Sequence, residues 1–412
     1  MKIAYLLKKF PSLSETFILT ELLIQERLGS DVRVFSRRQP DEEPRHPDVE
    51  LLRAPVEFLP RYGALTPWES LLTGAGMGLS GEDWFELQAL ALDLRDPVGD
   101  RLPRVVAEAL YLRQRTLELG VDHVHIHSAS ESAVVAHVLW RLGGPSYSMT
   151  AHAKEIHGSK VSIELLEWLI ASSSFTVTDC DANLAYLADR LSSRARERLR
   201  RLYSGVDLDG VPFIQEGRAE GHILAVGMLV EENGFDVLID ALAELSATGR
   251  SFRATLVGAG VAERELRARA KRRGLSPGAL EFTGPLPVED VRRLLARGTV
   301  LCLPCVGGGG GNRDALPTVL LEALAAGLPC VSTPVAGIPE ILHHGRVGRL
   351  VPERDALATA HELAELLDSS EERRHLASQG RRRAEELFDA GEAGATLAAW
   401  FQDAGRYAEK AR

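Results

Sequence analysis

Residues 314–345 read DALPTVLLEALAAGLPCVSTPVAGIPEILHHG, and they say most about the fold because they predict a helix that leads into a buried strand. Pro317 suits the first helical position, where the N–H that proline lacks would have no partner. The Leu- and Ala-rich run 318–326 predicts the helix, and Gly327 predicts its end. Residues 330–332 then predict a short strand. The stretch is therefore one helix–strand unit of an α/β fold.

Two carboxylates belong to this unit. Asp314 precedes the predicted helix, beside the free backbone N–H groups that attract anions at a helix N-terminus. Glu322 lies two turns into the helix, where it can reach a ligand on the same side. A ligand with an anionic group and several hydroxyls, such as a nucleotide sugar, suits this arrangement.

The rest of the chain alternates strand-like and helix-like segments in two halves. The first half predicts a helix at 14–25, a helical insertion over 40–103, and strands at 2–7, 31–36, 123–127, 147–150 and 175–178. The second half predicts strands at 223–226, 253–257, 280–282, 300–303 and 330–332, and helices at 235–245, 263–273, 288–296 and 318–326. Such alternation implies two doubly wound α/β domains with parallel sheets, which bind ligands at the carboxyl ends of their strands.

The composition of this 412-residue chain narrows the class of protein. Its length predicts two or three domains, and its 45% hydrophobic and 26% charged content is typical of globular proteins. A formal net charge of −10 argues against nonspecific binding to nucleic acid. No apolar run is long enough to span a membrane, and the start of the chain lacks the pattern of a secretory signal. We therefore expect a cytoplasmic protein.

Cys302 and Cys305 form a C-x2-C pair, a pattern that also occurs in zinc and redox sites. They lie in VLCLPCV, a buried-strand pattern, and no second pair of ligands follows. We interpret both cysteines as core residues.

The stretch 314–340 resembles the donor motif of the family 4 retaining glycosyltransferases, which is E-x7-E followed by A-x-G-x-P-V-V and G-I-P-E. Asp314 stands where the family has its first Glu, and the matching residues are Glu322, Gly327, Pro329, Gly337, Ile338, Pro339 and Glu340. The resemblance is to the exopolysaccharide and colanic-acid subgroup. It implies a GT-B fold, in which two Rossmann-like domains face a central cleft. Residues 1–206 would bind the acceptor, residues 220–388 the donor, and the helix 389–412 would pack back on the first domain.

The resemblance also implies roles for residues of this donor motif. Glu322 would bind the ribose, and Asp314 would bind the hydroxyls of the donor sugar as a catalytic residue. The neighbours that would line the donor site are Arg313, Ala315, Leu316, Pro317 and Thr318. The family needs no metal, so we expect neither a metal nor another cofactor.

Residues 226–242, VGMLVEENGFDVLIDAL, resemble a second donor motif, V-G-R-L-V-x-x-K-G-x-x-x-L-I-x-A. Gly227 matches the motif, but Met228 stands where the family has Arg, and Asn233 stands where it has Lys. In the family, these two cations clamp the diphosphate of the donor. The nearest substitutes by sequence are Arg313 and Lys154, so we expect compensation rather than loss of activity.

Glycine-rich loops complete the predicted donor side. Five glycines at 307–311 precede Asp314, and glycines allow a backbone to approach phosphate closely, although a flexible surface loop explains them equally well. Gly258 follows a predicted strand at a turn where the family packs a helix close to the donor. The loop 282–286, with Gly284 and Leu286, matches the segment that lines the nucleobase pocket through backbone groups.

The predicted acceptor side begins with residues 149–157, MTAHAKEIH, which resemble T-A-H-A-K-D-I of the same subgroup. His152 matches the histidine that contacts the donor sugar near the reacting centre, so it is a catalytic candidate, and Lys154 is an acceptor-binding candidate. His123, His125 and His127 alternate along one strand and so share one face. Three imidazoles suggest zinc, but His123 and His125 lie within the strand, where we expect a helix to cover them and no carboxylate or thiolate to contact them. The resembled family also needs no metal at this place, so we expect none. His127, at the end of the strand, is a candidate for binding the acceptor.

Two further segments complete the acceptor side. Residues 8–17, KKFPSLSETF, resemble the subgroup's entry loop, in which Ser12, Ser14 and Glu15 are acceptor-binding candidates, although Ser14 or Thr16 also suits a helix cap. Residues 194–201, RARERLRR, predict a basic helical face that is either solvated or in weak contact with an anionic membrane surface.

The predicted function is that of a retaining, metal-independent glycosyltransferase. It would move a sugar from a UDP or GDP sugar to a polysaccharide precursor, a lipid-linked carbohydrate or a small-molecule natural product. Two alternatives stay open, namely a nucleotide-sugar 2-epimerase and a nucleotide-sugar-binding protein with reduced turnover. A homodimer and a peripheral place at the inner membrane face also stay open.

Overall fold

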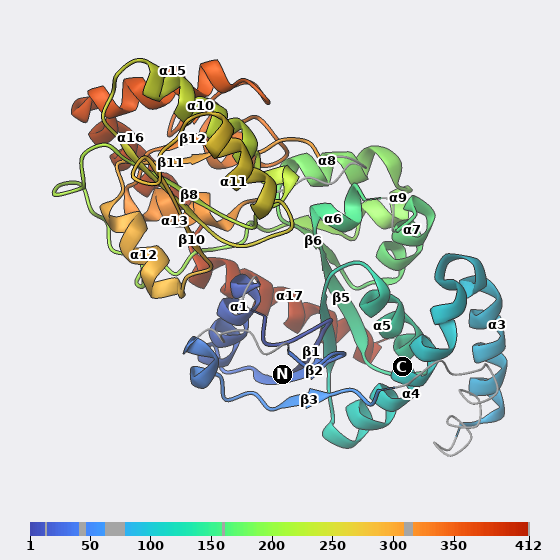
Figure 1. Cartoon of the computed structure of the whole chain (residues 1–412). Coiled ribbons are helices and arrows are strands. Elements are labelled where there is room, and N and C mark those ends of the chain that lie inside the picture. Colours follow the sequence, from blue (N-terminus) through green and yellow to red (C-terminus); the bar gives the residue numbers. More distant parts are fainter. Residues whose placement is uncertain (13–14, 41–46, 62–78, 159–160, 309–315, 411–412) are drawn as a thin grey trace. The chain divides into compact units, whose positions relative to one another are not determined.

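The computed structural model of the chain describes residues 1–12, 15–40, 47–61, 79–158, 161–308 and 316–410 (Figure 1). The chain forms two compact units. Unit 1 comprises Met1–Asp179, Leu184–Leu202 and Gly394–Arg412, and unit 2 comprises Cys180–Asn183 and Tyr203–Ala393.

Unit 1 is built on a seven-stranded parallel sheet in the order β3-β2-β1-β4-β5-β6-β7. Its strands are β1 (Lys2–Leu7), β2 (Asp31–Ser36), β3 (Val56–Phe58), β4 (His123–His127), β5 (Ser146–Ala151), β6 (Thr176–Thr178) and β7 (Leu199–Arg201). Its helical segments are α1 (Thr16–Arg27), η1 (Pro47–Leu51), α3 (Gly81–Val98), η2 (Gly99–Arg101), α4 (Leu102–Leu119), α5 (Glu131–Arg141), α6 (Ala153–Ile156), α7 (Ile163–Ser172), α8 (Asp181–Arg190) and α9 (Ser193–Arg196). Helix α17 (Ala390–Lys410) lies mostly in this unit.

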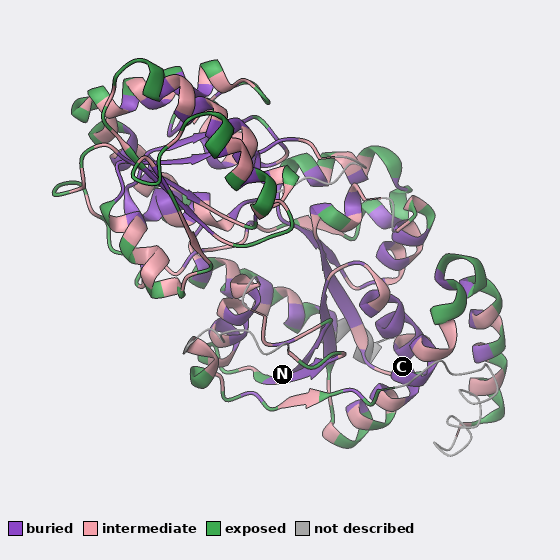
Figure 2. Cartoon of the chain, in the orientation of Figure 1, coloured by how far each residue is buried: buried purple, intermediate pink, exposed green. Residues whose placement is uncertain are grey.

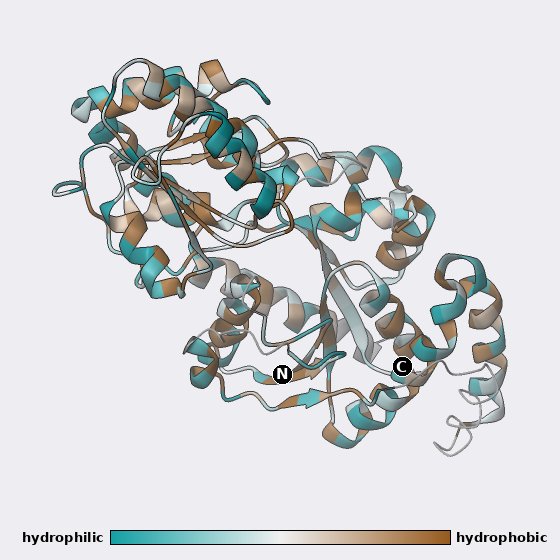
Figure 3. Ribbon diagram, in the orientation of Figure 1, coloured by the Kyte–Doolittle hydropathy of each residue, from teal (hydrophilic) through white to brown (hydrophobic). Residues whose placement is uncertain are grey.

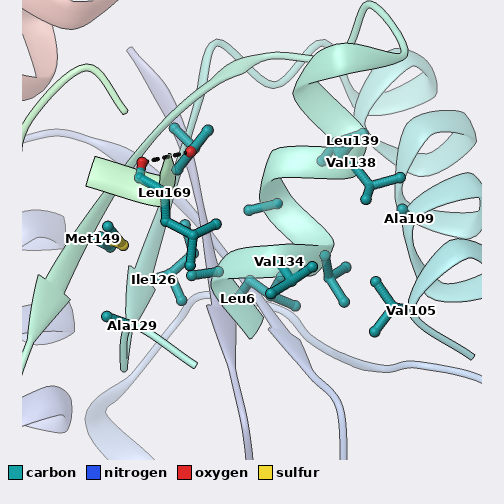
Figure 4. Packing of buried hydrophobic residues seen from close by; sticks show 14 of the residues in the cluster. Leu6, Val105, Ala109, Ile126, Ala129, Val134, Val138, Leu139, Met149 and Leu169 are labelled. Atoms are coloured by element: carbon teal, nitrogen blue, oxygen red, sulfur yellow. Dashed lines mark hydrogen bonds between the residues drawn. The ribbon is translucent and has the colours of Figure 1, made fainter. Parts of the chain in front are cut away.

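Helices cover both faces of this sheet. Ala4 and Leu6 of β1 belong to the core formed with α3, α4, α5 and α7, part of which is shown in Figure 4. Ile3, Tyr5 and Leu7 belong to the opposite core, formed with α1 and α17. Burial on both faces explains why β1 is an unbroken apolar run rather than an alternating one.

Unit 2 is built on a six-stranded parallel sheet in the order β10-β9-β8-β11-β12-β13. Its strands are β8 (His222–Val226), β9 (Arg253–Val257), β10 (Leu280–Gly284), β11 (Val300–Leu303), β12 (Cys330–Ser332) and β13 (Arg349–Leu350). Its helical segments are η3 (Glu231–Asn233), α10 (Phe235–Ala247), α11 (Glu263–Arg272), α12 (Val288–Arg297), α13 (Thr318–Ala326), α14 (Ile338–Ile341), η5 (His343–Gly345), α15 (Ala356–Asp368) and α16 (Ser370–Leu387). Helix α10 packs with α11 and α15, and α13 packs with α12 and α16.

The burial pattern follows from this layering. The strands of both sheets are mostly buried, whereas most helices expose one side, and α5 is buried nearly all round (Figure 2). Helix α11, with the sequence ERELRARAKR, buries Leu266 and Ala270 and is otherwise hydrophilic (Figure 3). The four cysteines are free and buried, which confirms the core interpretation of Cys302 and Cys305.

The predicted fold class of two doubly wound Rossmann-like domains is confirmed. Every predicted strand is present, within one or two residues at its ends. The short strands β3, β7 and β13 were not predicted. The prediction of one basic helix over 194–201 is wrong, because helix α9 ends at Arg196 and residues 199–201 form the edge strand β7. The insertion 40–103 is helical in part, but it also supplies β3, and its residues 41–46 and 62–78 lie outside the described ranges.

A search for membrane-spanning helices among the described residues finds none with the necessary length and apolar character.

Candidate functional site

The loops that follow β8, β9 and β10 are packed backbone against backbone at the carboxyl edge of the unit 2 sheet. Gly258 has a φ of +137°, and a Cβ there would lie 1.9 Å from the carbonyl oxygen of Gly227. The N–H of Gly258 donates to the carbonyl of Gly284 at 3.0 Å, and the N–H of Leu229 donates to the carbonyl of Ala259 at 2.9 Å. Only glycine permits this approach, so the predicted donor residues Gly227, Gly258 and Gly284 lie together.

The two positions where the family has cations differ sharply in exposure. The Met228 side chain is 59% exposed, whereas Asn233 is 6% exposed. The Asn233 Nδ2 donates to the carbonyl of Met228 at 2.8 Å, and the Cys305 thiol donates to its Oδ1 at 4.0 Å. Asn233 therefore folds inward and holds the loop, while Met228 points to solvent.

Replacing Asn233 by Ala is expected to lower the free energy of unfolding by about 0.5–1.5 kcal/mol, because the Met228 carbonyl loses the Asn233 donor and keeps only the Val230 N–H. Met228→Ala is the matched control, and it should change stability by no more than about 0.5 kcal/mol because that side chain is exposed. Chemical denaturation measures both values. Equal stability of the two variants would contradict the structural role of Asn233.

The segment after β11 is fixed by its neighbours up to the glycine run. A Cβ on Gly234, whose φ is +65°, would lie 1.9 Å from the carbonyl oxygen of Pro304. The N–H of Gly307 donates to Glu353 Oε2 at 2.8 Å, and Arg354 donates to the carbonyl of Gly307 and to Glu231, each at 3.2 Å. Gly307, the first of the five glycines, is thus anchored, and residues 309–315 of the segment lie outside the described ranges.

Helix α13 carries the best-defined part of the predicted donor site. Its N-cap residue is Pro317, which provides no side-chain cap, and no hydrogen bond from the N–H of Thr318 or Val319 is present among the described residues. The predicted donor residues Leu316, Pro317 and Thr318 lie at this end. Three further predicted residues, Arg313, Asp314 and Ala315, lie outside the described residues.

The carboxyl group of Glu322, on α13, has a raised pKa. Among the described residues, no hydrogen bond or ion pair reaches its carboxylate. Burial raises the pKa of Glu322 to about 7, and the positive charge of Arg292 opposes this shift. Arg292 itself has a buried Nε without a partner among the described residues. A part-buried carboxylate without a partner is costly, and a ligand hydroxyl could satisfy it.

Glu340 of the GIPE stretch has a structural task that the sequence did not reveal. Its carboxylate accepts from the N–H groups of Asp181 and Ala182 at 2.7 and 2.8 Å, and from the Tyr203 hydroxyl at 2.9 Å. An acidic group at a helix N-terminus stabilises the helix, so Glu340 caps the first residues of α8, which belong to unit 2 as Glu340 does.

In unit 1, the histidines of β4 form a hydrogen-bonded ladder with β5. His123 bonds Ser146 and Ser148 at 2.9 and 2.7 Å, and His125 bonds Ser148 and Thr150 at 2.8 and 3.2 Å. Burial lowers the pKa of His123 to about 3, so this ring is neutral. The predicted cover of the ladder is a helix, and the Phe401 ring of α17 does lie 5.1 Å from that of His125.

A carboxylate does approach this ladder, contrary to the expectation from the sequence. Glu21 of α1 lies 3.2 Å from His127 Nε2 and 3.9 Å from His125 Nε2, so that the three residues could hold a metal ion. Both ring nitrogens of His125 already bond hydroxyls, however, and the Tyr5 hydroxyl donates to the same Glu21 oxygen at 2.9 Å. A metal would have to displace these bonds, so the geometry favours a hydrogen-bonded cluster.

His127 and His152 come together at the carboxyl edge of the unit 1 sheet. Their rings stack with centroids 5.8 Å apart and an interplanar angle of 18°, and the Phe17 ring packs against both, at 5.8 and 5.4 Å. His152 Nδ1 lies 3.6 Å from Asp179 Oδ2. Burial pulls the pKa of His152 down, but Asp179, with Glu155 and Glu15, outweighs burial and leaves this pKa raised.

The backbone beside this pair is strained. Ser128 has a φ of +97° without being glycine, a conformation that is frequent at functional sites. Its hydroxyl bonds Ser130 at 2.7 Å and donates to Glu155 Oε1 at 3.1 Å. Glu155 also accepts from the His152 N–H at 3.1 Å, so it joins the loops after β4 and β5.

The other acceptor candidates that the structure describes lie before α1 and on α6. Glu15 is the N-cap residue of α1 and contributes to the raised pKa of His152. Ser12 lies in the preceding loop, Lys154 is exposed on α6, and Ser14 lies outside the described residues. The sequence missed Glu21, Asp179 and Phe17, because their proximity to the histidines depends on tertiary contacts.

Comparison with known proteins relates part of this chain to a family. Residues 220–369 match the family described as Glycosyl transferases group 1. The chain contains a glycosyl transferases group 1 domain. Over 391 residues, it is 28% identical to the putative colanic acid biosynthesis glycosyltransferase WcaL of Salmonella typhimurium, and the match covers 89% of this chain and 90% of the relative. The chain is therefore a glycosyltransferase.

Two further matches agree with this assignment. The amylovoran biosynthesis glycosyltransferase AmsK of Erwinia amylovora is 36% identical over 138 residues, which are 34% of each chain. The crystal structure of HepE from Anabaena in complex with UDP-glucose has a TM-score of 0.74 and 16% identity, and the match covers 98% of this chain and all of that one. At this identity the likeness shows the fold, which is GT-B. The matched domain contains Glu322 and the glycine loops, whereas the histidine pair belongs to unit 1.

Proposed function

We propose that this glycosyltransferase retains the anomeric configuration of a sugar that it moves from a UDP or GDP sugar to an acceptor hydroxyl. The observation that carries the proposal is on helix α13, where, among the described residues, no side chain caps the N-terminus and no hydrogen bond reaches the carboxylate of Glu322. The N–H groups suit a diphosphate, and the carboxylate suits hydroxyls.

The donor would be held by unit 2. Glu322 would accept hydrogen bonds from the ribose, and Asp314 would accept them from the donor sugar. The diphosphate would lie at the N-terminus of α13, near Leu316, Pro317 and Thr318, while the loop after β10 would receive the base. The complex of HepE with UDP-glucose supports a nucleotide-sugar donor.

The acceptor would be held by unit 1, with His127, His152, Glu15 and Lys154 as its contacts. The names of WcaL and AmsK refer to the biosynthesis of colanic acid and amylovoran, which supports a carbohydrate precursor, and a small-molecule natural product is the other acceptor class. We propose no enzymic nucleophile and no metal. The reaction would then depend on alignment of the acceptor hydroxyl, the leaving phosphate and the backbone N–H groups.

Turnover of UDP and GDP sugars, with and without an acceptor panel, tests this proposal. Nucleotide release that requires an acceptor, with an NMR spectrum showing that the glycosidic bond keeps the donor's configuration, is the expected result. Isomerised donor sugar without acceptor would instead indicate a 2-epimerase. Nucleotide binding without turnover would indicate a binding protein.

Restoring the family's cation at each of the two altered positions should have opposite effects. Met228→Arg is expected to tighten binding of UDP or GDP by about tenfold, because one charge-assisted hydrogen bond contributes about 1.5 kcal/mol or more and the position is exposed. Asn233→Lys should instead weaken binding, since a buried ammonium would replace the amide that holds the loop. Calorimetric titration with each nucleotide measures both effects. Tighter binding by Asn233→Lys would contradict the inward role of Asn233.

A further inference from the structure

Arg354 lies where three loops at the carboxyl edge of the unit 2 sheet meet. Its Nη2 donates to Glu231 Oε1 in the loop after β8 and to the carbonyl of Gly307 in the segment after β11, each at 3.2 Å. The neighbouring residue Glu353 accepts from the N–H of Gly307 at 2.8 Å. The loop after β13 is therefore joined to the loop after β8 and to the segment after β11 through this guanidinium and its neighbour.

This edge of the sheet carries little positive charge. Within the described part of the loops that follow the six strands, there is one lysine or arginine, Arg354, and there are four carboxylates. These loops are residues 227–234, 258–262, 285–287, 304–308, 333–337 and 351–355. The sequence suggested Arg313 and Lys154 as substitute cations, but Arg313 lies outside the described ranges and Lys154 belongs to unit 1. A diphosphate at this edge would be repelled by the carboxylates, so it needs a cation close by.

The backbone and the exposure of Arg354 indicate that the fold gains little from this side chain. Its φ is +59°, a left-handed conformation that favours glycine. Its ion pair with Glu231 is exposed, since 54% of the arginine side chain and 61% of the glutamate side chain are accessible, and such pairs contribute little to stability. Of its nitrogens, only Nη2 bonds a described residue, so Nε and Nη1 can donate to a ligand. The ion pair can thus be exchanged for a phosphate with little loss of stability.

We propose that Arg354 binds the diphosphate of the donor and supplies the positive charge that Met228 and Asn233 do not. On binding, the guanidinium leaves Glu231 and donates to diphosphate oxygens, for which its planar fork of donors is suited. The inference rests on the proposed function, in which the diphosphate lies at the N-terminus of α13. The segment that Arg354 anchors at Gly307 is the one that leads along the chain into this helix.

Arg354→Gly tests the proposal without straining the fold, because glycine suits the left-handed conformation. Its melting temperature should equal or exceed that of the wild type, whereas the Kd of UDP or GDP, whichever the wild type binds more tightly, should rise about tenfold. Arg250→Gly is the matched control, because it removes an arginine just before β9, at the amino end of the strand, and it should leave this Kd unchanged. Thermal unfolding and calorimetric titration measure the two quantities.

Glu231→Gln tests the exchange of partners, because it removes the carboxylate that competes with the diphosphate for Arg354. It should tighten binding of the same nucleotide about threefold in the wild-type chain and by less in the Arg354→Gly chain. An equal gain in both chains would overturn the exchange.

The titrations separate a failure of this inference from a failure of the donor assignment. If Arg354→Gly binds the nucleotide as tightly as the wild type does, Arg354 is not a diphosphate ligand, while the donor assignment stands. Weaker binding together with a lower melting temperature would mean that Arg354 acts through the fold, which also overturns the inference. If the wild type binds neither UDP nor GDP at millimolar concentration, the donor assignment fails and this inference fails with it.

Discussion

Replacing Glu322 by Gln is expected to lower kcat/KM for the nucleotide-sugar donor by about 10- to 100-fold. Hydrogen bonds to a charged group contribute about 1.5–3 kcal/mol each, and the amide keeps only one of the two acceptor oxygens. No described residue bonds this carboxylate, so we attribute the expected loss of activity to the ligand. Initial rates at varied donor concentration measure the effect.

The same substitution should stabilise the protein at neutral pH. The folded-state pKa of about 7 lies above the ordinary glutamate value near 4.3, so the folded state binds the proton more tightly than the unfolded state does. Wild-type stability therefore falls as the pH rises from about 4 to about 7, and it stays at the lower level above that range. Glu322→Gln removes this dependence, so its advantage should grow from near zero at pH 4 to at most about 3 kcal/mol above pH 7.

The control for both effects is Glu289→Gln, which changes an exposed glutamate on α12. It should alter neither the donor kinetics nor the pH dependence of unfolding. Loss of activity in Glu322→Gln together with a loss of stability at pH 7 would contradict the account, because it would mean that Glu322 is a structural residue with partners in the folded chain.

Gly258→Ala is expected to destabilise unit 2 by about 3 kcal/mol or more and to abolish nucleotide binding. Its φ of +137° is a conformation that other residues rarely adopt, and the new Cβ would lie 1.9 Å from the Gly227 carbonyl oxygen. The loops after β8 and β9 would have to separate, and with them the backbone that Asn233 holds in place. Thermal unfolding and nucleotide titration measure the two consequences.

Gly284→Ala is the matched control for this close approach. Gly284 also has a positive φ, +74°, but nothing lies within 4 Å of the added Cβ. Only the backbone preference is lost there, at a cost of about 1–2 kcal/mol. If the two variants were equally stable, the packing of the three loops could not be what holds this edge of the sheet together.

Local patterns predicted the elements that form the site in unit 2. Residues 318–326 and Gly327 gave helix α13 with the observed bounds, because proline, glycine and a run of Leu and Ala are local signals. The alternation of strands and helices gave both parallel sheets. It missed β3, β7 and β13, which are edge or terminal strands of two or three residues, too short to carry a periodic pattern.

Contacts between residues that are distant in the sequence determine side-chain roles that the sequence alone did not predict. Asn233 aligns with a position where the family has a cation, and only the fold shows its amide on the Met228 carbonyl. Glu340 resembled part of a donor motif, and the fold uses its carboxylate to cap α8. Glu21 and Asp179 are distant in sequence from the histidines that they face, and a single sequence does not reveal such pairs.

The measurement that most directly tests the donor assignment is the affinity of UDP and GDP, and of their 2′-deoxy forms, for the wild type and for Glu322→Gln. If Glu322 binds the ribose, the wild type should prefer the ribonucleotide by about tenfold or more, and the variant should lose most of this preference. If the variant keeps the full preference, or if neither nucleotide binds at millimolar concentration, Glu322 does not form the donor site and the account is wrong.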